Sequence, residues 1–511
     1  MKISTKKILA GILIFIVSLA LPAFVSCGGD YDNKNIAIDT SLDDYGISAG
    51  ETTTEERLYP NLDAVDFGGY EFTVLTRSAS AAYPDWAEWD HRDISAEEMN
   101  GDVINDAVYV RNKKIEEKYN ITIKEIVIDE SNWTVFPTKV RQSVSAGDDL
   151  YDIAVPHIFE STGLAQDGNF IDLFKVTNLD LKQPWWNQNC VRDLSIINKL
   201  FVIQGDLLIM DNDAMEAMIF NKSVQKDNAL ESPYDIVKKG EWTFEKLIEM
   251  SKGIAKDLNG DGKMYIKDDL FGYILQCDTA ASFIVSGGEK IAGKDENDYP
   301  IITFGTERCY RITDYLSEML SDTENSVNLH SYEGQFPIYD EQVKMMEENR
   351  ALFSWIRMRM VERLRGMEMD FGIIPLPKLD KNQEKYITST NTFTGAGVSI
   401  PRTATNLERT GMILEDLCAE SRYTLQPAYY EINLNGKYIR DNDSYEMLDI
   451  ILENTAYDIG HIYNFGGYMT TYLEYYGRSK KVEWVSGFEK SIIKMEKDIE
   501  KIVELYEKLD D

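Results

Sequence analysis

The chain has 511 residues, of which 87 are Asp or Glu and 53 are Lys or Arg, so its formal net charge at pH 7 is -34. A negative field of this size repels phosphate backbones and anionic lipid, which argues against nucleic acid as a partner. An aromatic content of 11% beside this charge suits neutral polar ligands or cations better than anions. The length exceeds what one ordinary hydrophobic core supports, so we expect at least two lobes.

The N-terminus has the pattern of an export signal. Lysines at the start form a positive region, and residues 8–21 are an apolar stretch of signal-peptide length, shorter than a membrane span. The stretch ends at Phe-Val-Ser-Cys, which resembles a bacterial lipobox. We therefore expect residues 1–26 to be a lipoprotein signal peptide and Cys27 to be lipidated.

A tether is expected next, over residues 27–65. This segment is rich in Gly, Asp, Asn, Thr and Glu and has few large apolar groups, so it cannot bury enough surface to fold. A lipidated Cys27 and a tether would hold a folded body at the extracellular face of the cell membrane. A plain signal peptide followed by an incidental cysteine is the alternative.

Four further cysteines, Cys190, Cys277, Cys309 and Cys418, are scattered and show no C-x-x-C spacing. Export permits disulfides, and four cysteines allow three pairings, between which the sequence does not choose. Buried free thiols are an equally good interpretation.

The first predicted elements alternate between strands and a helix. Strands are expected at 69–76, 121–128 and 151–155, and an amphipathic helix capped by Asp102 follows the first strand. The third strand opens onto His157. This alternation is typical of an α/β sheet, whose ligand crevice lies at the carboxyl ends of its strands.

The middle and the end of the chain continue the mixture of strands and helices. Further strands are expected at 200–204, 217–221 and 351–355, and a helix begins after Thr243. We expect the later helices to pack on the two lobes. They are predicted at 310–320, 342–348, 357–369, 412–418, 445–453 and 486–509, the last opened by a capping box from Ser486 to Glu489.

The chain is organised around residues 370–402. Two apolar, strand-like runs, 371–376 and 392–400, flank a polar segment that contains prolines. Gly395 and Gly397 let the second run bend or approach another segment closely. We interpret this stretch as a return crossing between two lobes, with the ligand-binding chemistry beside it.

The segment 257–268 fits the calcium-loop pattern D-x-N-x-D-G-x5-D. Calcium needs about six or more hard oxygen ligands, and this spacing wraps a short loop around one ion. Asp at the last position makes bidentate closure less secure than Glu would, and Asp269 competes for that position. A surface turn without metal is the alternative. The predicted ligands of a structural Ca ion are Asp257, Asn259, Asp261, the carbonyl of Lys263, and Asp268.

Several segments, in a fixed order, resemble a known family. They are NDAVYVRNKKIEEKYNI, YDIAVPHI, PWWN, FNKS, GEWTFEKL, DLNGDGK, DFGIIPLPK and GVSIPRT. With the lipobox and tether, they resemble the extracellular solute-binding lipoproteins that deliver ligands to ABC importers, closest to the carbohydrate-type branch. The resemblance covers the chain from about Gly69 to about Asn464.

The resemblance implies an α/β, two-lobed, type II periplasmic-binding-protein-like clamp with hinge crossings and extra C-terminal helices. Lobe 1 would be residues 66–175 plus 388–430, and lobe 2 would be 176–387 plus 431–511. It also implies a monomer without enzymatic activity, which closes over a small polar solute such as a sugar or oligosaccharide. The closed form would deliver this solute to the membrane subunits of an ABC permease.

Sugar sites in this family stack aromatic rings on pyranose faces and bind hydroxyls through carboxylates and amides. Trp355 is the first candidate, because the family's corresponding strand end often carries a ligand-stacking aromatic. For each aromatic ring, and above all for the PWWN pair, a place in the core is the alternative. The complete candidate set is Trp86, Trp89, Asp90, His157, Trp185, Trp186, Asp211, Trp355, Asn391 and Tyr430.

A membrane-anchored carbohydrate-active enzyme is the rival hypothesis. Such an enzyme needs two carboxylates facing each other across a cleft, and nothing in the sequence singles out a pair. G-x-S-x-G, H-E-x-x-H and phosphate-binding glycine loops are missing from the sequence. A dockerin-like adhesion element is a third hypothesis, against which the single, embedded calcium loop argues. The four histidines, His91, His157, His330 and His461, are too widely separated to suggest a zinc site.

Overall fold

The computed structural model describes residues 57–79, 90–130, 134–364, 369–430, 442–473 and 484–509. Leu58–Asp511 forms one compact unit. The predicted signal peptide, the lipidation site Cys27, most of the tether, and the candidates Trp86 and Trp89 lie outside the described residues. In the part of the chain that is described, no helix combines the length and the apolar character needed to cross a membrane.

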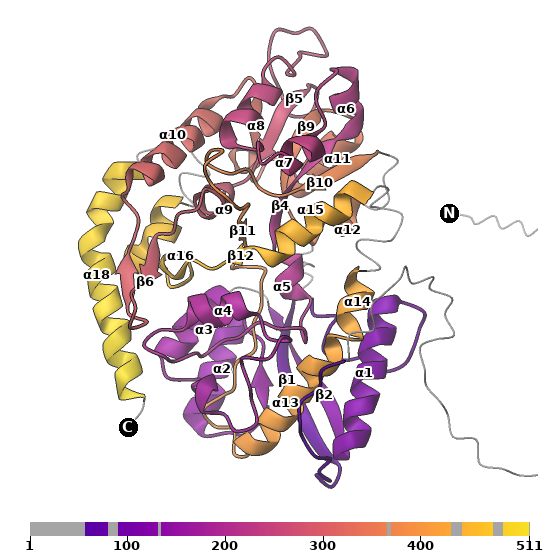
Figure 1. Ribbon diagram of the computed structural model, residues 1–511, viewed down its shortest axis with the longest axis vertical. Coiled ribbons are helices and arrows are strands. Elements are labelled where there is room, and N and C mark those ends of the chain that lie inside the picture. The colour runs from indigo at the N-terminus through magenta and orange to yellow at the C-terminus, as the bar shows by residue number, and fades with distance from the viewer. Residues whose placement is uncertain are drawn as a thin grey trace, which may run out of the picture. The chain divides into compact units, whose positions relative to one another are not determined.

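A three-stranded parallel sheet forms the core of the first lobe. Its strands, in spatial order, are β2 (Ile121–Glu130), β1 (Tyr70–Ala79) and β3 (Ile153–Ala154). All three were predicted from the sequence. Helix α1 (Val103–Tyr119) begins at the predicted cap Asp102, whose carboxylate accepts the backbone N–H of Asn105 at 3.0 Å. Helices α13 (Leu407–Ser421) and α14 (Leu425–Tyr430) pack against α1 (Figure 1).

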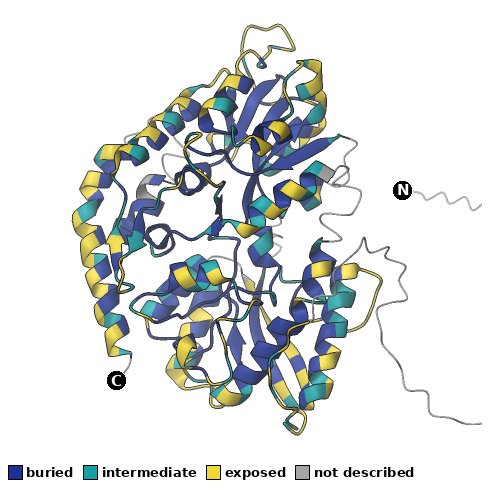
Figure 2. Cartoon of the chain, viewed as in Figure 1, coloured by how far each residue is buried: buried dark blue, intermediate teal, exposed yellow. Residues whose placement is uncertain are grey.

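A second, five-stranded sheet forms the core of the other lobe. In spatial order its strands are β10 (Phe371–Ile374), β4 (Glu216–Asn221), β9 (Ala351–Arg357), β5 (Phe271–Leu275) and β8 (Ser326–Asn328). β5 runs parallel to β8 and β9, whereas β4 runs antiparallel to β9 and β10. Every residue of β4, β5, β9 and β10 is buried (Figure 2), as expected for a sheet covered on both faces.

The predicted return crossing is confirmed. After β10 leaves the second sheet, the chain makes antiparallel bridges beside the first sheet, where Ser399 pairs with Ala154 and Ala396 pairs with His157. Between the two sheets, β11 (Thr388–Ser389) pairs with β12 (Thr455–Ala456). The central segment of the chain therefore connects the two sheets directly.

Two other passages connect the sheets. In the first, the chain leaves the bridge between Ile203 and Val398, forms α5 (Met210–Asp213) and enters the second sheet at β4. In the second, α14 lies against α1 of the first lobe, and α15 (Asn442–Glu453) packs against β10 of the second. The lobe boundaries given above stay predictions.

The remaining elements cover the two sheets and extend from them. The other helices described are α2 (Val135–Ala146), α3 (Ile158–Gln166), α4 (Gln188–Leu194), α6 (Lys222–Asp227), α7 (Pro233–Lys238), α8 (Phe244–Ser251), α9 (Thr279–Ser286), α10 (Glu307–Ser321), α11 (Ile338–Glu347), α12 (Met360–Leu364), α16 (Ile459–Ile462) and α18 (Trp484–Lys508). Shorter elements are β6 (Ala292–Lys294), β7 (Pro300–Ile302), η3 (Leu173–Lys175), η4 (Leu329–Tyr332), η6 (Phe465–Gly467) and η7 (Met469–Leu473). Thr243 caps α8, as predicted, by accepting the N–H of Lys246 at 3.2 Å.

Several predicted helix boundaries were wrong: α11 and α13 begin before the expected residues 342 and 412, and two further errors have a clear physical reason. The helix expected over 357–369 begins later, because Arg357 still pairs with Glu216 in the sheet; the helix seen there is α12. The C-terminal helix α18 starts at Trp484, so Ser486 lies inside it and is not its cap. Trp484 is buried, and its indole N–H donates to Ser317 at 3.1 Å, which anchors the first turn of the helix.

The question left open about the cysteines is answered by their positions. Cys190, Cys277, Cys309 and Cys418 are all buried free thiols. Burial raises the pKa of Cys190 and of Cys309, so these thiols stay protonated at neutral pH. They act as small core residues.

Candidate functional site

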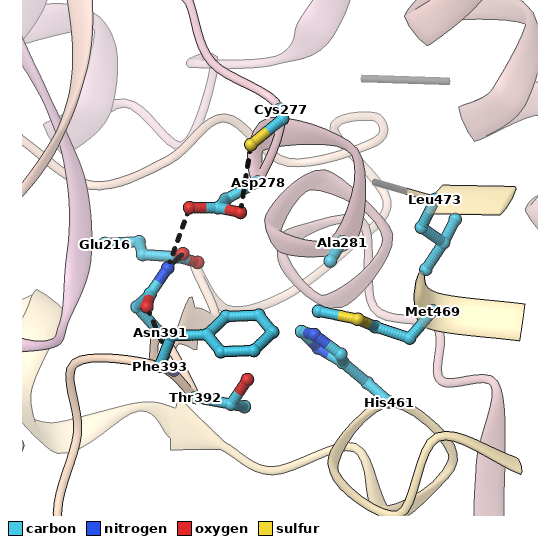
Figure 3. A pocket seen from close by; sticks show the side chains of 10 residues that line it. All are labelled: Glu216, Cys277, Asp278, Ala281, Asn391, Thr392, Phe393, His461, Met469 and Leu473. Atoms are coloured by element: carbon cyan, nitrogen blue, oxygen red, sulfur yellow. Dashed lines mark hydrogen bonds between the residues drawn. The ribbon is translucent and has the colours of Figure 1, made fainter. Parts of the chain in front are cut away.

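A pocket lies where the crossing segment meets the carboxyl end of β5 and the start of β4. It contains about 280 Å³ of space not filled by atoms, part of which is open to solvent. Helix α9, helix α16 and η7 complete its wall (Figure 3). The ten lining residues are Glu216, Cys277, Asp278, Ala281, Asn391, Thr392, Phe393, His461, Met469 and Leu473.

Asn391 is held in one orientation by bonds from both ends of its amide. The amide nitrogen donates to Oε1 of Glu216 at 3.3 Å and to Oδ2 of Asp278 at 3.1 Å. The amide oxygen accepts the backbone N–H groups of Phe393 at 3.2 Å and of Thr394 at 3.1 Å. Asn391 therefore links the turn of the crossing segment to two acidic side chains of the second lobe (Figure 3).

Glu216 and Asp278 are neighbours, because the same amide nitrogen of Asn391 lies within hydrogen-bonding distance of both. Burial, with repulsion from Asp278 in addition, raises the pKa of Glu216 to about 8. Hydrogen bonds from Ser389 and Asn391, and the charge of Arg357, oppose this shift only in part. At neutral pH Glu216 therefore holds a proton.

His461 faces the same space from α16 (Figure 3). Asp458 caps this helix by accepting the N–H of Gly460 at 2.9 Å. Burial lowers the pKa of His461 even though Asp458 and Asp278 oppose the change, so the imidazole is neutral at pH 7. Nε2 of His461 is buried and has no hydrogen-bond partner among the described residues. The imidazole is available to a ligand.

An aromatic wall joins the pocket to the first lobe. The ring of Phe393 lies with its centroid 4.8 Å from that of Phe159, which belongs to α3. The Thr162 hydroxyl of the same helix donates to the carbonyl of Ile462 at 3.3 Å. Groups from both lobes therefore meet around the pocket.

Trp355, the first candidate from the sequence, lies in the core. It is fully buried within β9, and its indole N–H donates to the Ser282 hydroxyl of α9 at 3.0 Å. It does not line the pocket, although Ala281, the neighbour of its partner on α9, does. A role for Trp355 in ligand binding stays a prediction.

Trp185 and Trp186 are also core residues. Both are buried, and their indole N–H groups donate to the two carboxylate oxygens of Glu415, at 3.1 Å and 2.9 Å. Gly205 is packed against them so closely that a Cβ atom there would lie 2.7 Å from the Trp185 carbonyl oxygen. These contacts agree with the alternative in which the PWWN pair packs in the core, and neither ring lines the pocket.

The other candidates lie around the passages between the sheets. His157 is fully buried at the start of α3, and burial, with Arg77 and His91 adding to it, lowers its pKa well below the ordinary value. Asp211 is buried in α5, where burial and neighbouring carboxylates raise its pKa. Tyr430 ends α14, and Asp90 is partly exposed. Of the described candidates, Asn391 is the one that lines the pocket.

The predicted calcium loop forms a closed turn. Asp257 accepts the N–H groups of Gly260 and Gly262 at 2.6 and 2.7 Å. Asp269 is buried and accepts those of Leu258 and Tyr265, whereas Asp268 is exposed. In the described part of the chain, no three His, Cys, Asp or Glu side chains are grouped as metal ligands. Calcium binding stays a prediction, and the competition from Asp269 is the feature that weighs against Asp268.

Sequence reasoning missed Glu216, Asp278 and His461. No local motif marks any of the three, and the fold brings them together from β4, the N-terminal end of α9 and α16. One signal was present: Asp278 closely follows the apolar run of β5, and side chains after parallel strands meet at one edge of a sheet.

Sequence profiles of known families and the sequences of curated proteins give no match to the chain. Solved structures do match. An ABC substrate-binding protein from Listeria monocytogenes in complex with cycloalternan superposes with a TM-score of 0.55 at 12% identity, over 84% of this chain and 99% of its own. The fold is the two-lobed type II periplasmic-binding-protein-like fold.

Two further structures share this periplasmic-binding-protein-like fold. UgpB from Mycobacterium tuberculosis in complex with glycerophosphocholine has a TM-score of 0.55 at 12% identity, over 85% of this chain and 99% of its own. The maltose/maltodextrin-binding domain MalE from Bdellovibrio bacteriovorus, bound to maltotriose, has a TM-score of 0.52 at 14% identity, over 84% and 100%. The pocket described above lies beside the crossing segment that connects the two sheets.

Proposed function

We propose that this protein is the extracellular solute-binding component of an ABC transporter, which captures a sugar or an oligosaccharide between two lobes and delivers it to a membrane permease. The observation that carries the proposal is the pocket at the Asn391 crossing, where polar and aromatic groups converge in a two-lobed fold. Solved proteins of this fold are described as bound to cycloalternan and maltotriose, which supports a sugar as ligand.

The side chains that line the pocket are of the kinds that bind sugars, namely an amide, two acids, an imidazole and an aromatic ring. One sugar ring would be held by Asn391, Glu216, Asp278 and His461, with Phe393 against its apolar face. The rest of a longer chain would extend between the lobes.

We also propose that lipidation of Cys27 holds the protein, as a monomer, at the extracellular face of the cell membrane. The order of positive region, apolar stretch and cysteine supports this proposal. Radiolabelled palmitate should enter the wild-type protein in cells and be absent from Cys27→Ala, which should be released into the medium. Label in the variant would contradict the proposal.

Calcium binding by the 257–268 loop is a separate proposal. The spacing of Asp257, Asn259 and Asp261 supports it. A chelator should lower the melting temperature of the wild-type protein and leave that of Asp257→Ala unchanged. Equal melting curves with calcium and with chelator would leave a metal-free turn, closed by Asp269.

The proposed function is tested by titrating the protein, from residue 58 onward, with maltose, cellulose, xylan and chitin oligosaccharides. Saturable changes in tryptophan fluorescence and a raised melting temperature are expected for one class of sugar. The same samples are then analysed for products. Accumulating product would favour the membrane-anchored enzyme, for which the Glu216 and Asp278 pair supplies two neighbouring carboxyl groups. A lack of response to every sugar would contradict the proposed ligand class.

A further inference from the structure

The charges that line the pocket are unbalanced. Glu216 and Asp278 are acidic, and no Lys or Arg is among the ten lining residues of the described structure. Arg357 is the cation whose charge acts on the Glu216 carboxyl, and its guanidinium donates to the Thr394 hydroxyl at 3.2 Å. His461 is neutral at pH 7 because burial lowers its pKa. The pocket therefore presents negative charge with no opposing charge in its wall.

Two buried polar atoms in the wall lack hydrogen-bond partners among the described residues. Ser389 and Asn391 both lie near the Glu216 carboxyl, yet its Oε2 atom has no hydrogen-bond partner among the described residues. Nε2 of His461, which belongs to α16, likewise has no hydrogen-bond partner among the described residues. A buried polar atom without a partner is unfavourable, so such atoms indicate a missing ligand group. A group with several N–H donors would satisfy both.

We infer that the solute bound in this pocket carries a primary ammonium group, as an amino sugar does, and that this group is placed against Glu216 and Asp278. The inference rests on the proposed function and narrows its class of ligand. An ammonium has three donors, enough to reach the two carboxyl groups and the His461 imidazole. The Phe393 ring adds a face that attracts cations.

The pair of acids also gives binding a characteristic pH dependence. Below pH 8, Glu216 holds a proton, because burial and Asp278 raise its pKa to about 8. Hydrogen bonds from Ser389 and Asn391 and the charge of Arg357 work against this shift, and the neutral His461 faces the same space. An arriving ammonium stabilises the carboxylate and expels the proton. Between pH 6 and pH 7, where an amino sugar still carries its ammonium, affinity should therefore rise with pH, and binding should release a proton.

The test compares two sugars that differ at the amine alone. Titration calorimetry at pH 6.5, where the amine is mainly protonated, is done with the disaccharide of glucosamine and with its N-acetylated form, in two buffers of different ionisation enthalpy. The free amine should bind at least tenfold more tightly and should release a proton. In Glu216→Gln, which keeps the shape of the protonated side chain, this preference should disappear. In Glu249→Gln, an exposed acid on α8, it should persist.

The outcomes separate the inference from the proposed function. Equal affinity for the two disaccharides, or preference for the acetylated one, would overturn the inference and leave sugar binding intact. Binding of neutral oligosaccharides with no binding of the amine would do the same. If no sugar binds, with or without an amine, both proposals fail. Melting curves of the two variants confirm that each is folded before it is titrated.

Discussion

The buried carboxyl group of Glu216 should make the folded protein less stable as the pH rises. Its pKa is raised from an ordinary value of 4.5 to about 8 by burial and by Asp278. Between these two values the folded protein keeps a proton that the unfolded chain releases. The folded state therefore binds more protons, and the free energy of unfolding decreases as the pH increases through this window.

The magnitude follows from the two pKa values. At about 1.4 kcal/mol per pKa unit, raising the pH from 5 to 9 should remove about 4 kcal/mol of stability through this one group. The Glu216→Gln variant has no ionisable group at this position, so its stability should not decrease in this way as the pH rises. Its stability relative to wild type should grow by about the same amount, ~4 kcal/mol, over that range.

Urea unfolding followed by tryptophan fluorescence, at pH steps from 5 to 9, measures this difference. Wild type, Glu216→Gln and the exposed control Glu249→Gln are compared at each pH. Subtracting the wild-type curve cancels the titration of the other 86 acidic groups as far as they are unaffected by the substitution. Parallel pH profiles for wild type and Glu216→Gln would refute the reasoning, since they would mean that Glu216 ionises normally in the folded protein.

Three further predictions concern stability. Glu415→Ala leaves two buried indole N–H groups without an acceptor and should cost about 3 kcal/mol in denaturant unfolding; an unchanged midpoint would contradict the core role. Asp213→Ala removes the carboxylate shared by Arg92 (3.0 Å) and Arg359 (3.3 Å) at the passage through α5, and should lower the free energy of unfolding by about 3 kcal/mol. A loss under ~0.5 kcal/mol would show that this cluster contributes no more than ordinary surface ion pairs do. Asp257→Ala should abolish any rise in melting temperature on adding calcium, and a persisting rise would place the metal elsewhere.

Much of the fold followed from local patterns. The strands β4, β9 and β10 are short apolar runs bounded by polar residues or prolines, and β1 alternates between apolar and polar residues. The caps at Asp102 and Thr243 follow from the preference of short oxygen-bearing side chains for helix starts. The errors came where tertiary packing overrode such signals. Ser486 has the sequence of a cap, but burial of Trp484 extends the helix past it.

Less of the candidate site than of the fold could be predicted from the sequence. The crossing was recognised, and with it Asn391, because prolines and glycines mark that segment. The acidic partners of Asn391 come from separate elements, and no local pattern connects them. Tryptophans were predicted as ligand contacts because such rings often stack on sugars. Trp185 and Trp186 instead pack in the core, where the Glu415 carboxylate accepts both indole N–H groups.

The central claim is that the pocket beside Asn391 holds the solute. Once a sugar that binds is known, the most direct test is its dissociation constant for wild type, for Asn391→Ser, and for Asn382→Ala, an exposed control in the same segment. Serine keeps an acceptor for the turn but loses the amide that orients Glu216 and Asp278. The account predicts at least tenfold weaker binding for Asn391→Ser, with the control unchanged. Equal dissociation constants for all three proteins would contradict it.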